Sequence, residues 1–328
     1  MSFRGKVILL GSLCAALLVT FLLGQVFSPE RKAGGGAALF PGLKTEAVRK
    51  VSVKAGSAEI LLVREKDWLL QESGRSFPAS AKRVDSMLKE ISTLKRGNVI
   101  TSRQDAWAGL GLQGADAKIL TLYGGKGEKL AELTIGKTGV GGGGSYIRLG
   151  DEKQVYQTGS SLASSMETER RFWSDLRLLP DGLKPENVTR ISFRGRMAFE
   201  EGKKARSLDY SLLKAADAKG KMHWTFEGQK DEAIDEAKVE QILSNMIGAE
   251  GNDFADASEN TRKAMAEAKA EVTFSLGDNR EYTLVVGSKA EGSQYYASLK
   301  GGELAYLVPE WRLERILVER DSLKSPTR

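Results

Sequence analysis

Several residue groups in this 328-residue chain have types and spacings that occur in active sites. Ser92-x-x-Lys95, Lys137-Thr138-Gly139 and Ser258-x-Asn260 are similar to the serine acyl-enzyme motifs of penicillin-binding proteins. Their order argues against that chemistry, because the lysine-threonine-glycine motif of those enzymes comes last, whereas here it precedes Ser258. The sequence therefore does not predict an acyl-enzyme mechanism.

A second pattern, Ala131-x4-Gly136-Lys137-Thr138, fits a relaxed phosphate-binding loop, in which backbone amides and a lysine hold phosphates ahead of a helix. Residues 132–135 alternate as a strand does, and the glycine-rich stretch from 139 to 144 follows where that helix would have to begin. The pattern instead predicts a strand followed by a glycine loop.

His223 is the one histidine in the chain, so a catalytic triad or a multi-histidine metal site would have to use it. Strand alternation places Met222, Trp224 and Phe226 inward and His223 outward. Asp235, among several acidic residues, is expected to cap a helix. We therefore predict no catalytic residue, no metal site and no cofactor.

Three tryptophans could stack on a ligand or a partner. Trp107 lies beside Gly109 and Gly111, and Trp173 and Trp311 lie near the edges of expected helices. Such residues are candidate contact positions, although aromatic side chains at these spacings also build cores.

The elements that must position these residues follow an apolar N-terminal segment. Val7 to Phe27 is a run of twenty-one uncharged residues, and as a helix it would be about 30 Å long, enough to span a bilayer. Arg4 and Lys6 precede it, so residues 1–6 should stay cytoplasmic and the body should lie outside. A cleaved secretory signal is the alternative, but its apolar core is shorter and ends in a small-residue site.

Charge excludes one class of partner. Residues 33–185 hold 23 basic and 17 acidic side chains, and residues 186–328 hold 22 and 25. No stretch interleaves basic clusters with aromatic residues, so we predict no nucleic-acid partner. Cys14, the one cysteine, falls inside the apolar run, and the body must therefore be stabilised by its packed core rather than by disulfides.

After a tether rich in glycine and proline, the pattern becomes α+β. Short apolar runs predict strands at Val48–Val53, Ala58–Arg64, Asp67–Gln71, Lys118–Tyr123, Lys129–Ile135, Tyr146–Leu149 and Gln154–Gln157. Ser80 should cap a helix whose apolar face is Val84, Met87, Leu88 and Ile91. A second helix is expected over Ser160–Arg171.

The same order returns after Pro185. A helix after Asp235 carries Val239, Ile242, Leu243 and Met246, each 155 positions after a residue of the first apolar face. Trp224 corresponds to Trp68, and Val188–Phe193 to Val48–Val53. We predict two copies of one α+β unit, each with a mainly antiparallel sheet and packed amphipathic helices. The expected organisation is a cytoplasmic N-terminus (1–6), a transmembrane anchor (7–27), a tether (28–47) and two repeats (48–180 and 186–324).

These residues resemble a bacterial family described as domain of unknown function 4340. The likeness rests on short motifs: Trp68-x-Leu70, Phe77-Pro78-Ala79, Gly109-Leu110-Gly111-Leu112, Ile135-Gly136, Tyr146-Ile147-Arg148 and Val155-Tyr156. The resemblance implies an envelope role beside ABC-type export systems of the kind linked to gliding motility. Tyr296-Ala297-Ser298 in the second copy lacks the arginine found as Arg148, so a site that uses Arg148 would exist once.

We therefore expect a single-pass membrane protein with an extracytoplasmic body, which binds a protein partner in a cell-envelope or ABC-type transport assembly without catalysis. Trp107, Arg148, Trp173 and Trp311 are the candidate contact residues, and Val7 and Phe27 bound the anchor. The alternatives are an anchored envelope hydrolase and a cell-wall glycan-binding protein.

Overall fold

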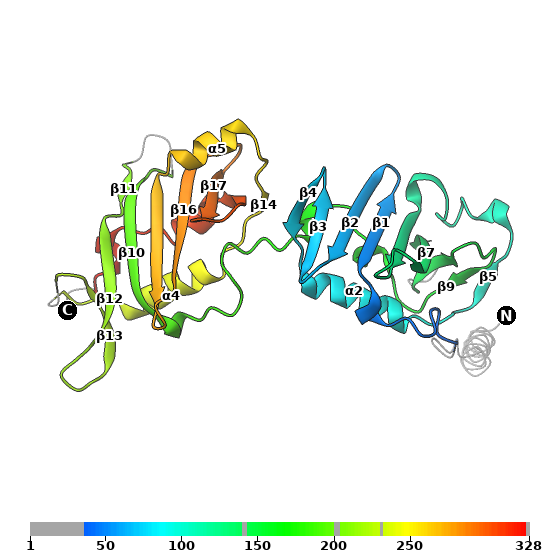
Figure 1. Cartoon of the computed structure of the whole chain (residues 1–328), viewed down its shortest axis with the longest axis horizontal. Coiled ribbons are helices and arrows are strands. Elements are labelled where there is room, and N and C mark those ends of the chain that lie inside the picture. Colours follow the sequence, from blue (N-terminus) through cyan, green and yellow to red (C-terminus); the bar gives the residue numbers. More distant parts are fainter. Residues whose placement is uncertain (1–35, 140–142, 200–203, 230–231, 326–328) are drawn as a thin grey trace, which may run out of the picture. The chain divides into compact units, whose positions relative to one another are not determined.

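The chain divides after Trp173 into two units, each containing one antiparallel sheet (Figure 1). The computed structural model describes residues 36–139, 143–199, 204–229 and 232–325. Within these ranges no helix is long and apolar enough to span a bilayer. The predicted anchor from Val7 to Phe27 lies outside the described residues.

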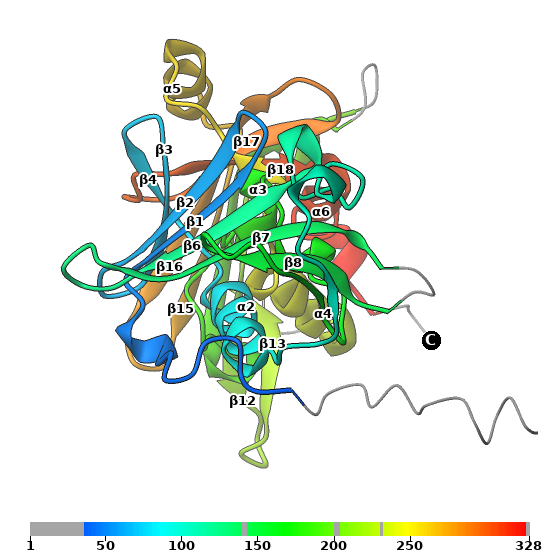
Figure 2. The same cartoon turned by 90° about the vertical axis from the view of Figure 1, so that its right-hand side faces the viewer.

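The first unit has nine strands among its described residues, all paired antiparallel. In sheet order they are β4 (Arg75–Pro78), β3 (Trp68–Glu72), β2 (Ala58–Arg64), β1 (Lys50–Ala55), β6 (Lys118–Tyr123), β7 (Lys129–Thr138), β8 (Ser145–Leu149), β9 (Val155–Gln157) and β5 (Val99–Thr101). Helix α2 (Ala81–Thr93) lies along one face of this sheet (Figure 2), and α3 (Arg170–Trp173) ends the unit.

The second unit repeats that order. Its sheet consists of β13 (Met222–Phe226), β12 (Tyr210–Ala216), β10 (Val188–Met197), β15 (Ala270–Leu276), β16 (Glu281–Lys289), β17 (Gln294–Leu299), β18 (Ala305–Pro309) and β14 (Asp253–Phe254), with β11 (Arg206–Ser207) paired to the end of β10. Its helices are α4 (Glu236–Ile247), α5 (Glu259–Ala266) and α6 (Glu310–Glu314).

Strand register shows which positions correspond. Trp68 pairs with Arg64 across β2 and β3, and Trp224 pairs with Lys214 across β12 and β13. In both units the cation lies over the indole ring, at 5.5 Å for Arg64 and 5.2 Å for Lys214. Both tryptophans are buried. The two tryptophans therefore occupy equivalent core positions, which is consistent with the predicted repeat.

The helices that cover the two sheets bury the predicted side chains. Val84, Met87, Leu88 and Ile91 are the buried residues of α2, and Val239, Ile242, Leu243 and Met246 are those of α4. The caps differ, because the Asp235 side chain accepts a hydrogen bond from the Lys238 N–H, whereas the Ser80 side chain makes no such bond. Burial of the apolar face, rather than a shared cap, is thus the common feature of both helices.

Each unit begins earlier than its first long strand. The Leu39 N–H donates to the Leu94 carbonyl (2.8 Å), as the Leu178 N–H donates to the Ala249 carbonyl (3.0 Å). The sequence placed the start of the folded part at Val48, whereas residues 37–47 already belong to the first unit. The signal for this start is the similarity of Pro41-Gly42-Leu43-Lys44 to Pro180-Asp181-Gly182-Leu183-Lys184.

The predicted helix over Ser160–Arg171 is wrong. Only a short turn at Ala163–Ser165 and the four residues of α3 are helical there. The Leu162 N–H donates to Ser145 Oγ (2.9 Å) and Lys118 Nζ donates to the Ala163 carbonyl (3.1 Å), so other elements use backbone groups that a helix would need.

Two further expectations need correction. Met222 was placed inward, but it is 53% exposed because the β12–β13 hairpin extends past the helix-covered part of the sheet, while Trp224 and Phe226 are buried as predicted. Strands β4 and β5 were not predicted, since three or four residues give too short a pattern.

Candidate functional site

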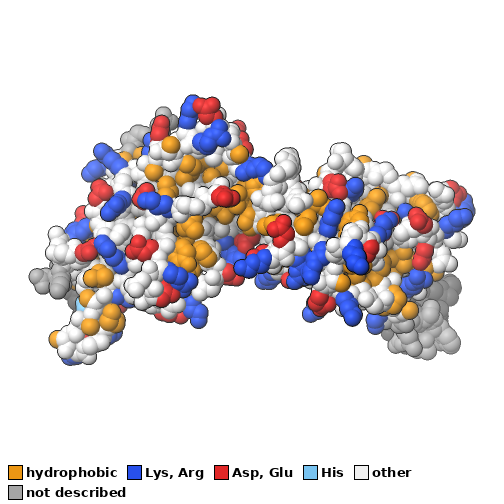
Figure 3. Space-filling model, viewed as in Figure 1, with side chains coloured by type: hydrophobic (Ala, Val, Ile, Leu, Met, Phe, Trp, Pro, Cys, Tyr) orange, Lys and Arg blue, Asp and Glu red, His pale blue; other side chains and the backbone are white. Residues whose placement is uncertain are grey.

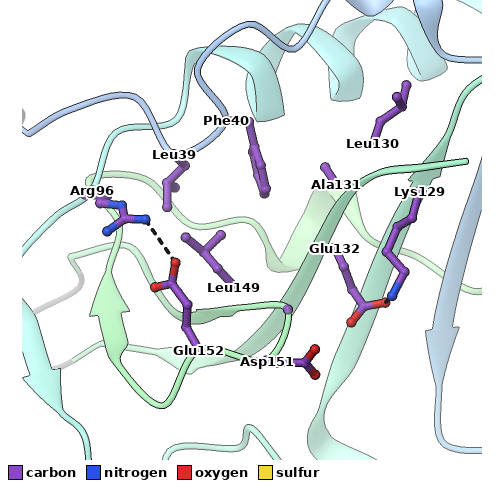
Figure 4. A pocket seen from close by; sticks show the side chains of 11 residues that line it. Leu39, Phe40, Arg96, Lys129, Leu130, Ala131, Glu132, Leu149, Asp151 and Glu152 are labelled. Carbon is purple, nitrogen blue, oxygen red and sulfur yellow. Dashed lines mark hydrogen bonds and ion pairs between the residues drawn. The ribbon is translucent and has the colours of Figure 1, made fainter.

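A hollow of about 380 Å³ opens on the first unit (Figure 4). Its apolar lining includes Leu39, Phe40 and Leu149, and charged side chains stand at its rim. Four segments form it: the segment before β1, the residues after α2, strand β7, and the end of β8 with the turn that follows. The hollow is within the size range of small-ligand and side-chain pockets.

Backbone hydrogen bonds hold these elements in place. The Arg96 N–H donates to the Ala37 carbonyl (2.8 Å), which ties the first segment to the end of α2. On the opposite side the Gly150 N–H donates to the Glu132 carbonyl (3.1 Å), where β8 turns away from β7. Gly150 has a φ of 41°, a left-handed conformation that glycine adopts without strain.

A polar network forms one wall of the hollow. Arg96 pairs with Glu152 (3.0 Å), and the Tyr156 hydroxyl donates to Glu152 (3.0 Å). The Arg96 guanidinium also lies over the Tyr156 ring, at 5.3 Å from its centroid. Burial, and then the bond to Glu152, raise the pKa of Tyr156, so this hydroxyl keeps its proton at neutral pH and remains a donor.

The other wall carries a second ion pair and a carboxylate that belongs to neither ion pair. Lys129 pairs with Glu132 (2.7 Å), and this hydrogen bond raises the pKa of Lys129. Asp151 lies between the two pairs in the turn after β8 and has no ion pair among the described residues. The rim therefore holds three carboxylates and two cations, and one negative charge is left uncompensated.

In the second unit a larger side chain occupies the equivalent place. Ala131 pairs with Leu122, and the equivalent Tyr282 pairs with Phe274 and stacks on its ring (5.4 Å between centroids). A methyl group in the first unit thus replaces a phenol in the second.

Two charged residues of the rim are replaced by glycine in the second unit. The Arg96 N–H bonds the Ala37 carbonyl as the Gly251 N–H bonds the Leu176 carbonyl, so glycine replaces the arginine. The Glu152 N–H bonds the Leu149 carbonyl as the Gly302 N–H bonds the Leu299 carbonyl, so glycine also replaces the glutamate. Because both units share one fold, that fold requires neither the small Ala131 nor these two charges.

Two of the predicted contact residues come together elsewhere in the first unit. The Arg148 guanidinium lies 4.6 Å from the centroid of the Trp107 ring, and Trp107 packs in a cluster with Leu112, Tyr146 and Val155. Arg148 also donates to the carbonyl of Gly150. Both Trp107 Nε1 and Arg148 Nε are buried without a partner, so this cluster is closed to solvent and supports the β8–β9 turn beside the hollow.

The other predicted tryptophans separate. Trp173 is fully buried and its Nε1 donates to the Glu167 carbonyl (2.7 Å), so it is a core residue rather than a contact residue. Trp311 is 49% exposed, and the Arg312 and Arg315 guanidinium groups each lie 4.8 Å from its ring centroid.

The motifs with the spacing of active sites do not form one. Residues 129–138 are strand β7, which confirms the strand interpretation of the phosphate-loop pattern. Ser92 donates to the Lys89 carbonyl in its own helix, and Ser258 caps α5. His223 lies half-buried in β13, and the described residues contain no cluster of three metal-ligating side chains.

Sequence reasoning missed the hollow, and Arg96, Ala131, Asp151 and Glu152 with it. The available signal was the alignment of the two copies, which sets Ala131 against Tyr282 at the same 151-residue offset as Ile135 against Val286. Charges of both signs are interspersed over both units on the face that Figure 3 shows.

Comparison with known proteins identifies the family but no activity. A curated relative, an uncharacterized protein of Treponema pallidum (strain Nichols), is 24% identical over 133 residues, which is 40% of this chain and 42% of the relative. The match thus spans less than half of that protein. No solved structure matches the chain. The family model described as "Domain of unknown function (DUF4340)" matches residues 68–263 and again 224–325, and the chain therefore belongs to the DUF4340 family.

Proposed function

We propose that this chain is a single-pass, membrane-anchored extracytoplasmic protein whose first unit binds a protein partner in a cell-envelope or ABC-type transport assembly, without catalysis. The observation that carries the proposal is the hollow, because among the described residues the second copy places the larger Tyr282 where the hollow has Ala131. The two units keep the same core and differ at this recessed surface. We infer that the surface has acquired a contact in the first unit that the second unit does not make.

The charges at the hollow favour recognition over proton transfer. Glu132 and Glu152 are each engaged by a cation of the rim, which leaves Asp151 as the carboxylate open to a ligand. An anchored hydrolase would need two carboxyl groups free to act on its substrate, and is therefore the weaker candidate.

Glycan binding through Trp311 is the second candidate, because half of this side chain is exposed. Sugars stack on the faces of aromatic rings, but the guanidinium groups of Arg312 and Arg315 already lie against this ring. That arrangement makes Trp311 less suited to a sugar than the hollow is to a peptide.

Membrane topology is tested with a reporter fused after Gly42. Because Arg4 and Lys6 hold the N-terminus inside, a periplasmic reporter such as alkaline phosphatase should be active and a cytoplasmic one inactive. Exchanging Arg4 and Lys6 for glutamate is the matched control and should lower the difference. A fusion at Gly42 that is active in the cytoplasm would contradict the proposed location.

Partner binding is tested in the intact cell with a photoreactive benzoylphenylalanine in place of Phe40, whose ring points into the hollow (Figure 4). Irradiation should attach one envelope protein, and a second change, Ala131→Tyr, should abolish that product because it fills the hollow as Tyr282 does in the second unit.

The control places the same photoreactive group at Glu281, beside Tyr282, where no product is expected. Equal products from both positions, or a Phe40 product that survives Ala131→Tyr, would argue against the hollow as the binding site.

A further inference from the structure

Strand β7 runs past the end of its neighbour at the hollow. Its pairing with β8 ends at Leu133 and Leu149, followed by one bond from the Gly150 N–H to the Glu132 carbonyl (3.1 Å). Residues 129–131 continue beyond that bond as part of β7. A stretch of strand edge that no neighbouring strand pairs offers backbone donors and acceptors to another extended chain.

The two sides of this free edge differ in chemistry. Side chains of a strand alternate between faces, so Ala131 faces the apolar lining with Leu149, and Glu132 faces the opposite side. A bulge at Leu130, where the register with β6 shifts, brings Lys129 to the side of Glu132. Leu39 (4% exposed) and Leu149 (7%) make the apolar side, whereas Lys129, Glu132 and Asp151 make the charged side. An added strand would therefore meet an apolar surface with one face and a charged surface with the other.

We infer that the hollow binds an extended polypeptide segment of the partner, paired to the edge of β7 at residues 129–131, with apolar side chains toward Leu149 and a lysine or arginine at Asp151. The inference rests on the proposed function and names the ligand class for the same site. Asp151 selects the basic residue because the other two carboxylates, Glu132 and Glu152, already have cation partners.

The second unit shows why the edge alone is not sufficient. The bond from the Lys300 N–H to the Thr283 carbonyl (2.8 Å) corresponds to the bond between Gly150 and Glu132. Lys300 replaces Gly150 there, Gly301 follows in place of Asp151, and Tyr282 occupies the apolar recess. The same strand end is thus filled, and glycine stands where the first unit has the carboxylate of Asp151.

Phage display tests this inference. A library of random heptapeptides is first depleted on the Ala131→Tyr variant and then selected for binding to the detergent-solubilised full chain. Bound peptides should alternate apolar residues with lysine or arginine. N-methylation of one central backbone nitrogen in a selected peptide should weaken binding about fivefold, the effect of one lost hydrogen bond. Asp151→Asn should weaken peptide binding about threefold, and this effect should be smaller in 0.5 M salt because salt screens the charge.

Glu303→Gln, which removes an exposed carboxylate from the equivalent turn of the second unit, is the control and should leave binding unchanged. An acidic consensus, insensitivity to N-methylation, or selection of the same peptides on the Ala131→Tyr variant would overturn the inference. If the selection fails while the Phe40 cross-link persists and still depends on Ala131, the ligand class is wrong and the binding function stands. If neither the peptide selection nor the Phe40 cross-link succeeds, both the ligand class and the proposed binding function are wrong.

Discussion

Replacing Trp68 or Trp224 with alanine should destabilise the unit that contains it by about 3–5 kcal/mol, the usual cost of removing a buried tryptophan. Both side chains are nearly inaccessible, at 2% and 4% exposure. Each also loses the cation over its ring, and Trp68 loses the bond from Nε1 to Asp85 (3.2 Å). Urea denaturation followed by tryptophan fluorescence and far-UV circular dichroism measures the change.

Hydrogen exchange assigns the loss to one unit, because Trp68→Ala should expose the amides of α2 and Trp224→Ala those of α4. Trp311→Ala is the control, since half of that side chain is already in water, and it should change stability by no more than about 0.5 kcal/mol. Unchanged midpoints for both buried tryptophans would remove the main support for equivalent core positions.

Gly136→Ala is expected to cost about 1–3 kcal/mol, the range for overpacking a core. An added Cβ at Gly136 would lie 2.3 Å from the Leu110 carbonyl oxygen, which is backbone and cannot turn aside. The loop from Trp107 to Leu112 would have to move off the sheet, and with it the ring under Arg148. Gly287 has the same close approach in the second unit, at 2.4 Å from the Ala264 carbonyl oxygen.

Thermal melting of the Gly136→Ala and Gly287→Ala variants tests both contacts. Gly159→Ala is the control, because nothing lies within 4 Å of its added Cβ. Equal melting of all three variants would mean that the glycines are not required for packing. A larger loss at Gly136 than at Gly159, without loss of the Phe40 cross-link, would separate stability from binding.

Much of each unit could be predicted because its signals are local. The apolar faces of α2 and α4 recur with the helical period, and the predicted bounds of Ala58–Arg64 and Lys118–Tyr123 are those of β2 and β6. Ser160–Arg171 failed because its serines and apolar residues fit a helix locally, while bonds to Ser145 and Lys118 from other elements decided its backbone.

By itself, the sequence determined the repeated α+β unit and the correspondence of its core positions. The apolar periods of helices and strands can be recognised from residues that are close together along the chain. Only the tertiary structure decided where the hollow lies. The fold brings Arg96 next to Glu152, which lies 56 positions later in the chain. It also ends the pairing with β8 at Leu149, so that β7 extends beyond its neighbour. Ala131 leaves a recess because it is small compared with the side chains around it. Those neighbours come from distant parts of the sequence, so no local pattern predicts the recess.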